Sequence, residues 1–194
     1  MTSEIVLIMG AYLLGSIPTG LLLAKAVGVD IRTTGSGNIG ATNVYRTLGR
    51  RVGIMTLIGD CLKGLIPVLI ARHLQLPEIW VAATGLAAFL GHVYTVFLRF
   101  KGGKGVATAL GVFIGISPLS VLAALAIFVF TLIKWRYVSL ASITAAAAIP
   151  FLVALIEKKG LLITMSVIIA ALVVFKHREN IRRLRSGTEN VFKR

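Results

Sequence analysis

Cysteine, histidine and acidic residues are scarce in this chain of 194 residues. It contains one cysteine, three histidines and seven aspartate and glutamate residues. A single cysteine excludes an intrachain disulfide, and its place in an apolar run predicts that Cys61 is a small buried hydrophobic residue. The histidines and carboxylates are scattered along the chain, whereas metal sites need clustered ligands. We therefore expect neither a bound metal ion nor another cofactor.

Apolar residues and positive charge are abundant instead. Hydrophobic residues make up 57% of the chain and the mean hydropathy is +0.90, whereas a soluble domain has about 45–50% apolar residues. This composition indicates an all-α, polytopic integral membrane protein. The net charge of +14 would suit nucleic-acid binding, but such a protein has no soluble domain to provide that surface. The basic loops are better interpreted as topology signals and as sites for anions, including those of membrane lipid.

Seven apolar runs are candidate membrane spans. A full crossing needs about 20 helical residues, and four of the runs have that length. The fourth run has 11 residues, and Gly115, Ser117 and Pro118 separate it from the short fifth run. These two runs are compatible with one kinked helix or with a tight helical hairpin. The seven runs are Ile5–Ala24, Val52–Ala71, Ile79–Leu98, Val106–Ile116, Leu119–Ile133, Tyr137–Ile156 and Leu161–Phe175.

The distribution of lysine and arginine distinguishes these alternatives. Seven crossings place 17 basic residues on one side and three on the other, with Lys63 inside a span, whereas merging the fourth and fifth runs gives ten on each side. The positive-inside rule therefore predicts seven transmembrane helices, with the N-terminus outside and the C-terminus in the cytoplasm. We expect a multi-pass protein of the cytoplasmic (inner) membrane whose first apolar run is retained as a helix. No internal repeat or linker divides the chain, so residues 1–194 are predicted to form one transmembrane domain.

A polar, glycine-rich segment follows the first apolar run. It contains three glycines and four uncharged hydrogen-bonding residues: Gly35, Gly37, Gly40, Ser36, Asn38, Thr42 and Asn43. Glycines allow positive φ and close approach of backbone N–H groups to a ligand, so the segment is suited to an oxyanion or a polar head group. It matches G-x-G-x-x-G, but a membrane span rather than a strand precedes it, which argues against dinucleotide binding. The alternative is a flexible turn, which would not need so many hydrogen-bonding side chains.

A second glycine-rich segment, residues 100–108, leads directly into the fourth run. Its central residues are Gly102, Gly103, Lys104 and Gly105. Glycine and lysine at the start of a helix favour phosphate, because the free N–H groups and the helix dipole add positive potential. It is not a Walker A motif, because Gly105 occupies the Ser/Thr position and the upstream glycine is missing. We interpret Lys104 as functional, and Arg99 and Lys101 as membrane anchors.

The C-terminal tail, residues 176–189, is basic. If the seventh helix continues into it, His177 and Asn180 lie on one face and Gly187 ends the helix. Asp60 and Lys63 lie one turn apart within the second run, where they either neutralise each other or brace the first loop. Ser139 and Ser142, at the start of the sixth run, are compatible with a simple N-cap.

The three segments together resemble those of the bacterial acyl-phosphate:glycerol-3-phosphate acyltransferases of the PlsY type. The first motif of that family is G-S-G-N-x-G-A-x-N, here Gly35–Asn43, and the second is K-G-G-K-G-V-A-T, here Lys101–Thr108. The third is R/K-H-x-E-N-I-x-R-L followed by G-x-E, here Lys176–Leu184 with Gly187 and Glu189. The resemblance covers the chain from end to end, and the motif cores show no departure.

The resemblance implies transfer of a fatty acyl group from acyl phosphate to the 1-hydroxyl of sn-glycerol 3-phosphate, giving lysophosphatidic acid and phosphate at a site that faces the cytoplasm. The enzyme that makes acyl phosphate is then a candidate partner. Acyl phosphate is already activated, so we favour direct attack without an acyl-enzyme. The proton acceptor is either His177 or the phosphate of the donor. The expected catalytic residues are Ser36, Asn38, Thr42, Ser142 and His177, and the expected binding residues are Gly35, Gly37, Gly40, Asn43, Arg46, Gly102, Gly103, Lys104, Gly105, Asn180 and Glu189.

The main alternative from another functional class is a membrane transporter of phosphate or organophosphate. A transporter needs a polar path through the bilayer, and the ionisable residues within the spans are essentially Asp60 and Lys63. The H-x-x-x-x-D dyad, the G-x-S-x-G elbow and the D-x-x-D-G metal motif are all missing. The sequence therefore favours the acyltransferase.

Overall fold

The computed structural model describes residues 2–192, and within that range every regular element is a helix. The chain divides into two compact units, Met1–Ile116 and Ser117–Arg194. The first unit contains α1 (Thr2–Ser16), α2 (Thr19–Ala26), the 3-10 turn η1 (Ile31–Thr33), α3 (Ala41–Leu48), α4 (Arg50–His73), α5 (Glu78–Val93), the 3-10 turn η2 (Val96–Leu98) and α6 (Val106–Ile116). The second contains α7 (Pro118–Trp135), α8 (Val138–Ile156), α9 (Gly160–Lys176) and α10 (Arg178–Arg185).

The first apolar run is broken rather than continuous. Helix α1 ends at Ser16 and α2 begins at Thr19, with a bend of 40° between them. Pro18 lies at the break and explains it, because proline has no N–H to donate and disfavours the helical conformation of the residue before it. The run Ile5–Ala24 therefore forms two helices where the sequence predicted one.

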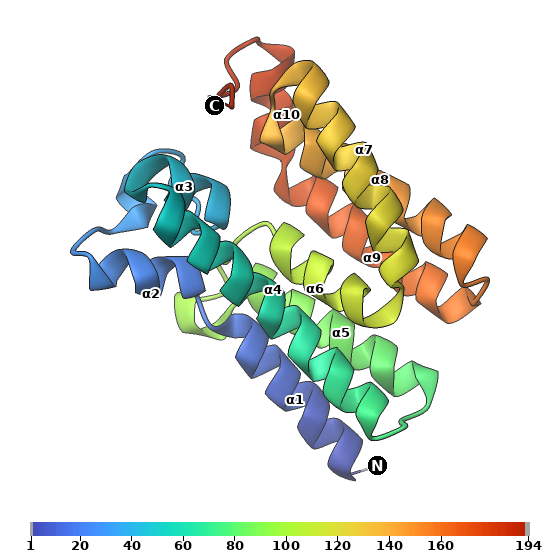
Figure 1. Ribbon diagram of the computed structural model, residues 1–194. Coiled ribbons are helices and arrows are strands. Elements are labelled where there is room, and N and C mark those ends of the chain that lie inside the picture. The colour runs from blue at the N-terminus through green and yellow to red at the C-terminus, as the bar shows by residue number, and fades with distance from the viewer. Residues whose placement is uncertain (1, 193–194) are drawn as a thin grey trace. The chain divides into compact units, whose positions relative to one another are not determined.

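Helices α1, α4, α5 and α6 form the body of the first unit. Helix α1 packs on α5, α4 packs on α6, and α4 also contacts α1 and α5, as the blue and green helices of Figure 1 show. The α4–α6 contact is close because Gly64 faces the Thr108 carbonyl and Gly111 faces the Cys61 carbonyl, where an added Cβ would overlap either oxygen. Small residues at a helix interface permit this approach of two backbones.

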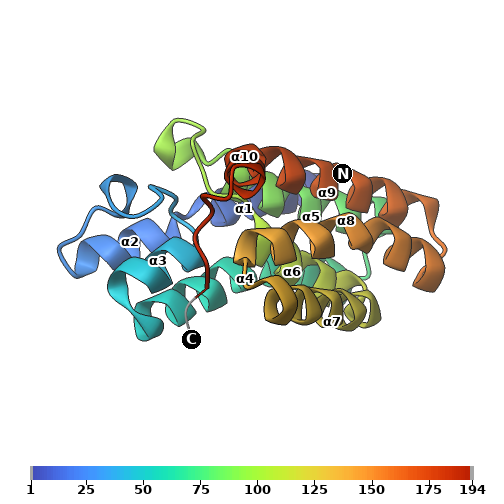
Figure 2. The ribbon, with the colours of Figure 1, turned by 90° about the horizontal axis from the view of Figure 1, so that it is seen from above.

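The second unit is a bundle of three long helices followed by a short one. Helix α8 lies between α7 and α9 and packs on both, as Figure 2 shows. The chain bends by 55° between α9 and α10 at His177, so the seventh apolar helix does not continue straight into the tail. Helix α10 ends as the sequence predicts: Gly187 has φ +70°, and the Thr188 N–H donates to the Arg183 carbonyl at 2.9 Å, which is a Schellman motif.

Several helices of the described part are suited to a membrane. Four are long and apolar enough to cross it, namely α4, Glu78–Leu98, α7 and α8, and the number is six if the bent pairs α1–α2 and α9–α10 each form one span. Helix α6 is apolar but has only 11 residues. Large apolar side chains such as Leu122, Phe130 and Ile133 on α7 are more than 60% exposed, as expected for lipid contact. The count of seven crossings and their direction remain predictions.

Candidate active site

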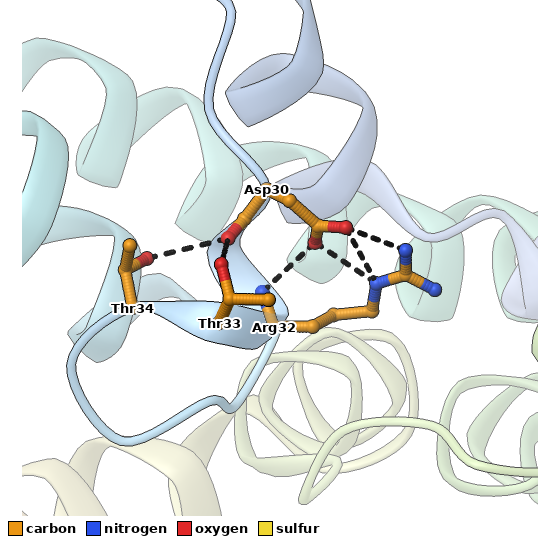
Figure 3. A network of polar contacts seen from close by, with 4 residues as sticks. All are labelled: Asp30, Arg32, Thr33 and Thr34. Atoms are coloured by element: carbon orange, nitrogen blue, oxygen red, sulfur yellow. Dashed lines mark hydrogen bonds and ion pairs between the residues drawn. The ribbon is translucent and has the colours of Figure 1, made fainter.

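A polar network fixes the chain where it enters the first glycine-rich segment (Figure 3). The Asp30 carboxylate caps η1 by accepting from the Arg32 N–H at 3.1 Å, and it accepts from Arg32 Nε at 2.9 Å. The Thr33 hydroxyl donates to the Asp30 carbonyl at 2.9 Å. The hydrogen bonds from the Arg32 side chain and backbone lower the pKa of Asp30 to about 2. The conformation of this turn fixes the direction in which the chain enters the glycine-rich segment at residue 34.

The side chain of Asn43 organises that segment from inside. Asn43 is 3% exposed, and its Oδ1 accepts from the Ser36 N–H at 2.9 Å. Its Nδ2 donates to the carbonyls of Ile31, Thr34 and Asn38 at 3.3, 3.1 and 2.9 Å. The segment is therefore held in a defined conformation, contrary to the flexible-turn alternative. These contacts indicate that Asn43 shapes the loop, and a direct contact with substrate remains a prediction.

Two of the three glycines have the conformation that the sequence analysis expected. Gly35 and Gly37 have φ of +59° and +69°, a region that L side chains rarely adopt. Gly40 instead has φ −76° and is the N-cap of α3. Its N–H donates to Asn38 Oδ1 at 2.9 Å, and an added Cβ would crowd that oxygen. Glycine is therefore required at position 40 because a side chain would lack room there, and not because φ is positive.

The remaining predicted residues of the first segment reach the surface of the unit. Ser36, Thr42 and Arg46 are exposed, and Asn38 is half-buried. Thr42 and Arg46 both lie on α3, four residues apart and so on one helical face. Side chains in these positions are accessible to a ligand in solution or at a membrane surface.

The second glycine-rich segment lies at the same end of the first unit. Leu98 of η2 packs against the buried cluster of Leu21, Ala24, Ile31, Ile39 and Val44, which underlies the first segment. The Thr95 hydroxyl donates to the Ser16 carbonyl, at the end of α1. Both segments therefore lie at the end of the unit opposite the N-terminal end of α1 (Figure 1).

Lys104 lies two residues before the start of α6, where the sequence analysis placed the start of the fourth run. The N–H groups of Gly102 and Gly103 donate to the carbonyls of Val93 and His92 at 3.2 Å each, so the segment is fixed on the C-terminal end of α5. Gly105 has φ +81°, and an added Cβ there would overlap the Phe89 ring. Lys104 is half-buried, whereas Lys101 is exposed; the different roles of the two stay a prediction.

In the second unit the Glu189 carboxylate joins residues from two helices. Its Oε1 accepts from the Ser139 hydroxyl at 2.9 Å and from Asn180 Nδ2 at 2.8 Å, and its Oε2 accepts from Arg183 Nε at 2.7 Å. Burial raises the pKa of Glu189, but these three hydrogen bonds outweigh it, so the pKa lies below 4.5. The sequence indicated Glu189 and Asn180, but it gave no sign that Ser139 and Arg183 complete the network.

Ser142 and His177 are buried in the second unit, at 5% and 3% exposure. The Ser142 hydroxyl donates to the Val138 carbonyl at 2.8 Å. His177 Nδ1 lies 2.8 Å from the Val173 carbonyl, which can only accept, so Nδ1 carries a hydrogen and a neutral ring keeps its lone pair on Nε2. The N-cap interpretation of the two serines was wrong, because Tyr137 is the N-cap of α8 and makes no side-chain cap.

The ion pair expected in the second apolar run is present. Lys63 Nζ lies 2.9 Å from Asp60 Oδ1, and both side chains are at most 5% exposed. Lys63 also donates to the Ile17 carbonyl at 2.9 Å. The pair therefore neutralises itself, which was one of the two alternatives, and Lys63 also binds the chain at the break between α1 and α2. That the pair braces the first glycine-rich loop stays a prediction. No group of three potential metal ligands occurs among the described residues.

Comparison with known proteins connects this arrangement with one family. The sequence model of the family described as glycerol-3-phosphate acyltransferase matches residues 5–187. The glycerol-3-phosphate acyltransferases of Geobacter sulfurreducens and Geobacter metallireducens are 69% and 71% identical to this chain, and each alignment covers 100% of both chains.

Solved structures agree with the sequence comparison. The crystal structure of PlsY (YgiH), an integral membrane glycerol 3-phosphate acyltransferase, in its glycerol 3-phosphate form superposes with a TM-score of 0.95 at 46% identity, covering 98% of this chain and 96% of the other. The lysophosphatidic acid form gives a TM-score of 0.92 at 45% identity, with the same coverage. Sequence and fold agree over nearly the whole chain, which therefore belongs to the glycerol-3-phosphate acyltransferase family, of the PlsY type.

Proposed function

We propose that this protein transfers a fatty acyl group from acyl phosphate to the 1-hydroxyl of sn-glycerol 3-phosphate, at the cytoplasmic face of the inner membrane. The observation that carries the proposal is the pair of glycine-rich segments held at one end of the first unit, one rigidified by Asn43 and the other fixed on α5. Both substrates carry phosphate, which suits such segments. The donor also carries an acyl chain, which suits a site beside apolar helices.

The first unit is assigned the binding of phosphate and of the reacting carbonyl. Lys104 and Arg46 bind phosphate through their charges, with the backbone of residues 104–105. The N–H groups of Gly102 and Gly103 already donate to carbonyls of α5, so these two glycines contribute by fixing the segment. Ser36, Asn38 and Thr42 hold the mixed anhydride and donate to the oxyanion as it develops. These roles fit the exposed side chains of Ser36 and Thr42, which belong to a segment that Asn43 holds in a defined conformation.

Three residues of the second unit also have roles in this proposal. Ser142 supports the anhydride, and His177 and Asn180 contact glycerol 3-phosphate. In the reaction the 1-hydroxyl oxygen attacks the acyl carbon, and the bond between that carbon and the phosphate oxygen then breaks. The hydroxyl proton passes to His177 Nε2 or to the departing phosphate. Orientation and charge supply the rate, because acyl phosphate needs no further activation.

The donor is tested with purified protein in lipid nanodiscs. Synthetic acyl phosphate should release phosphate only when glycerol 3-phosphate is present, with one lysophosphatidic acid formed per phosphate, and acyl-CoA should not replace it. Phosphate release without glycerol 3-phosphate would contradict the proposal. Uptake of labelled glycerol 3-phosphate into proteoliposomes without acyl transfer would support a transporter instead.

Direct attack is tested separately by isotope exchange. An acyl-enzyme would form reversibly from acyl phosphate alone, and it would then incorporate labelled inorganic phosphate into the donor. We expect no such exchange in the absence of glycerol 3-phosphate. Exchange at a rate comparable to turnover would show that an acyl-enzyme forms.

A further inference from the structure

Three buried ionisable side chains of the first unit lie outside the glycine-rich segments. Asp60 and Lys63 belong to α4, and His92 belongs to the last turn of α5, with exposures of 2%, 4% and 4%. His92 Nδ1 lies 3.7 Å from Asp60 Oδ1, too far for a hydrogen bond, and the two form an ion pair when the ring is protonated. Buried ionisable groups are costly in a membrane protein, so each of them needs a physical reason.

The break between α1 and α2 accounts for Lys63. The helix ends at Ser16, and the Ile17 carbonyl accepts from Lys63 Nζ at 2.9 Å. The same carbonyl also accepts from the Thr19 N–H at 3.0 Å, so Lys63 adds a second hydrogen bond at the break. Asp60 balances the charge of Lys63. The hydrogen bond to Ile17 does not involve His92, so the burial of His92 needs a separate explanation.

The other side of the His92 ring contacts the second glycine-rich segment. A Cβ added at Gly103 would overlap His92 Nε2, so the backbone of residue 103 lies directly against the ring. The Gly103 N–H also donates to the His92 carbonyl at 3.2 Å. The same residue thus contacts Gly103 through its ring and through its backbone. The next residue along the chain is Lys104.

We propose that His92 is a positioning residue that sets the place of Lys104, with Asp60 orienting the ring from the opposite side. The inference rests on the proposed phosphate-binding role of Lys104. A flexible lysine binds phosphate well only when its backbone is held in place, and an error of 1 Å in a catalytic group can cost about 100-fold in rate. His92 supplies a rigid planar surface, which an aliphatic side chain at this position would not.

A double-mutant cycle between His92 and Lys104 tests the proposal. His92→Ala should lower kcat/KM at least about tenfold, chiefly by raising the KM of the substrate whose KM Lys104→Ala also raises. With Lys104→Ala already present, His92→Ala should cost less than about twofold more, because there is no longer an ammonium group to position. Losses that simply multiply would overturn the proposal, since they would mean that His92 acts independently of Lys104.

Two further variants separate positioning from stability. His92→Asn restores a polar planar group and should recover part of the activity lost in His92→Ala. If His92→Ala does not accumulate in the membrane, His92→Asn takes its place in the double-mutant cycle. Thr84→Val is the matched control. Thr84 is fully buried on the same helix as His92, and its hydroxyl has no hydrogen-bond partner within the described residues. The kinetics of this variant should equal those of the wild type. A His92 variant with a lower melting temperature but unchanged KM would overturn the proposal. An unchanged KM in Lys104→Ala alone would show instead that the proposed role of Lys104 is wrong, and the inference would then fall with it.

Discussion

Asn180 Nδ2 donates to Glu189 Oε1 at 2.8 Å, and this bond ties the chain that follows α10 back to the helix. The same oxygen accepts from Ser139 at the start of α8. One carboxylate thus links α8, α10 and the end of the tail. The Asn180 hydrogen that binds Glu189 is not available to a substrate. Any contact with glycerol 3-phosphate would therefore use the other Nδ2 hydrogen of Asn180 or its Oδ1.

Glu189→Ala should destabilise the protein by at least about 2 kcal/mol, because it leaves buried donors without an acceptor. Thermal unfolding in detergent measures the effect. The matched control is Glu179→Ala, an exposed glutamate on α10, which should change stability by less than about 0.5 kcal/mol. Similar melting temperatures for the two variants would show that the Glu189 network contributes little.

The Glu189 network should also depend on pH in one direction. Its pKa in the folded protein lies below 4.5, so its contribution to stability is complete above pH 4.5 and is lost as the pH falls through the folded value. The melting temperature of the wild type should therefore drop more steeply with acid than that of Glu189→Gln. Parallel curves for the two proteins would contradict this assignment.

Lys104→Ala should lower kcat/KM at least about tenfold, equivalent to 1.4 kcal/mol, because a charge bound to phosphate stabilises both the ground state and the transition state. Lys101→Ala should change little, since Lys101 is exposed and is interpreted as an anchor. Steady-state kinetics with each substrate varied in turn measures both variants. Equal losses would mean that the anchor and the ligand have been confused.

The two roles proposed for His177 require opposite protonation states. Because Nδ1 faces the Val173 carbonyl, a base must be neutral with an unprotonated Nε2, whereas a phosphate ligand must carry a second hydrogen. A base should contribute about 10²–10⁴-fold to the rate, which should fall in acid. A ligand should bind glycerol 3-phosphate more tightly in acid instead. We expect the ligand behaviour, since departing phosphate can accept the proton.

His177→Gln distinguishes the two roles when glycerol 3-phosphate and acyl phosphate are varied separately. For a ligand, the KM for glycerol 3-phosphate should rise and a hydrogen-bonding replacement should retain part of the activity. If kcat collapses while that KM is unchanged, and the acid limb of the pH profile disappears, His177 is the base.

The three motifs should all face the cytoplasm, because seven crossings place 17 of the basic residues on that side. Single cysteines at positions 38, 104 and 180, in a protein whose Cys61 has been replaced, should resist a membrane-impermeant thiol reagent in spheroplasts. They should react once the membrane is permeabilised. Efficient labelling from outside at any of the three would refute this topology.

The sequence alone determined those features that depend on neighbouring residues. The apolar runs predicted helices because a membrane span must satisfy its backbone hydrogen bonds internally. The start of α6 after Gly105 and the end of α10 before Gly187 were equally local, because they follow from the conformations that glycine allows. The motifs themselves were sufficient to indicate the family, which the comparisons confirmed.

Only the tertiary structure decided how these pieces are held. Asn43 was predicted to bind substrate, yet its amide contacts Ile31, Thr34, Ser36 and Asn38. Ser139 was compatible with a helix cap but donates to a carboxylate 50 residues away, and the ring of His92 lies against Gly103. Periodicity places a residue on a helical face but does not specify which distant group meets it there. That depends on how the helices pack and on which buried polar atoms must find partners.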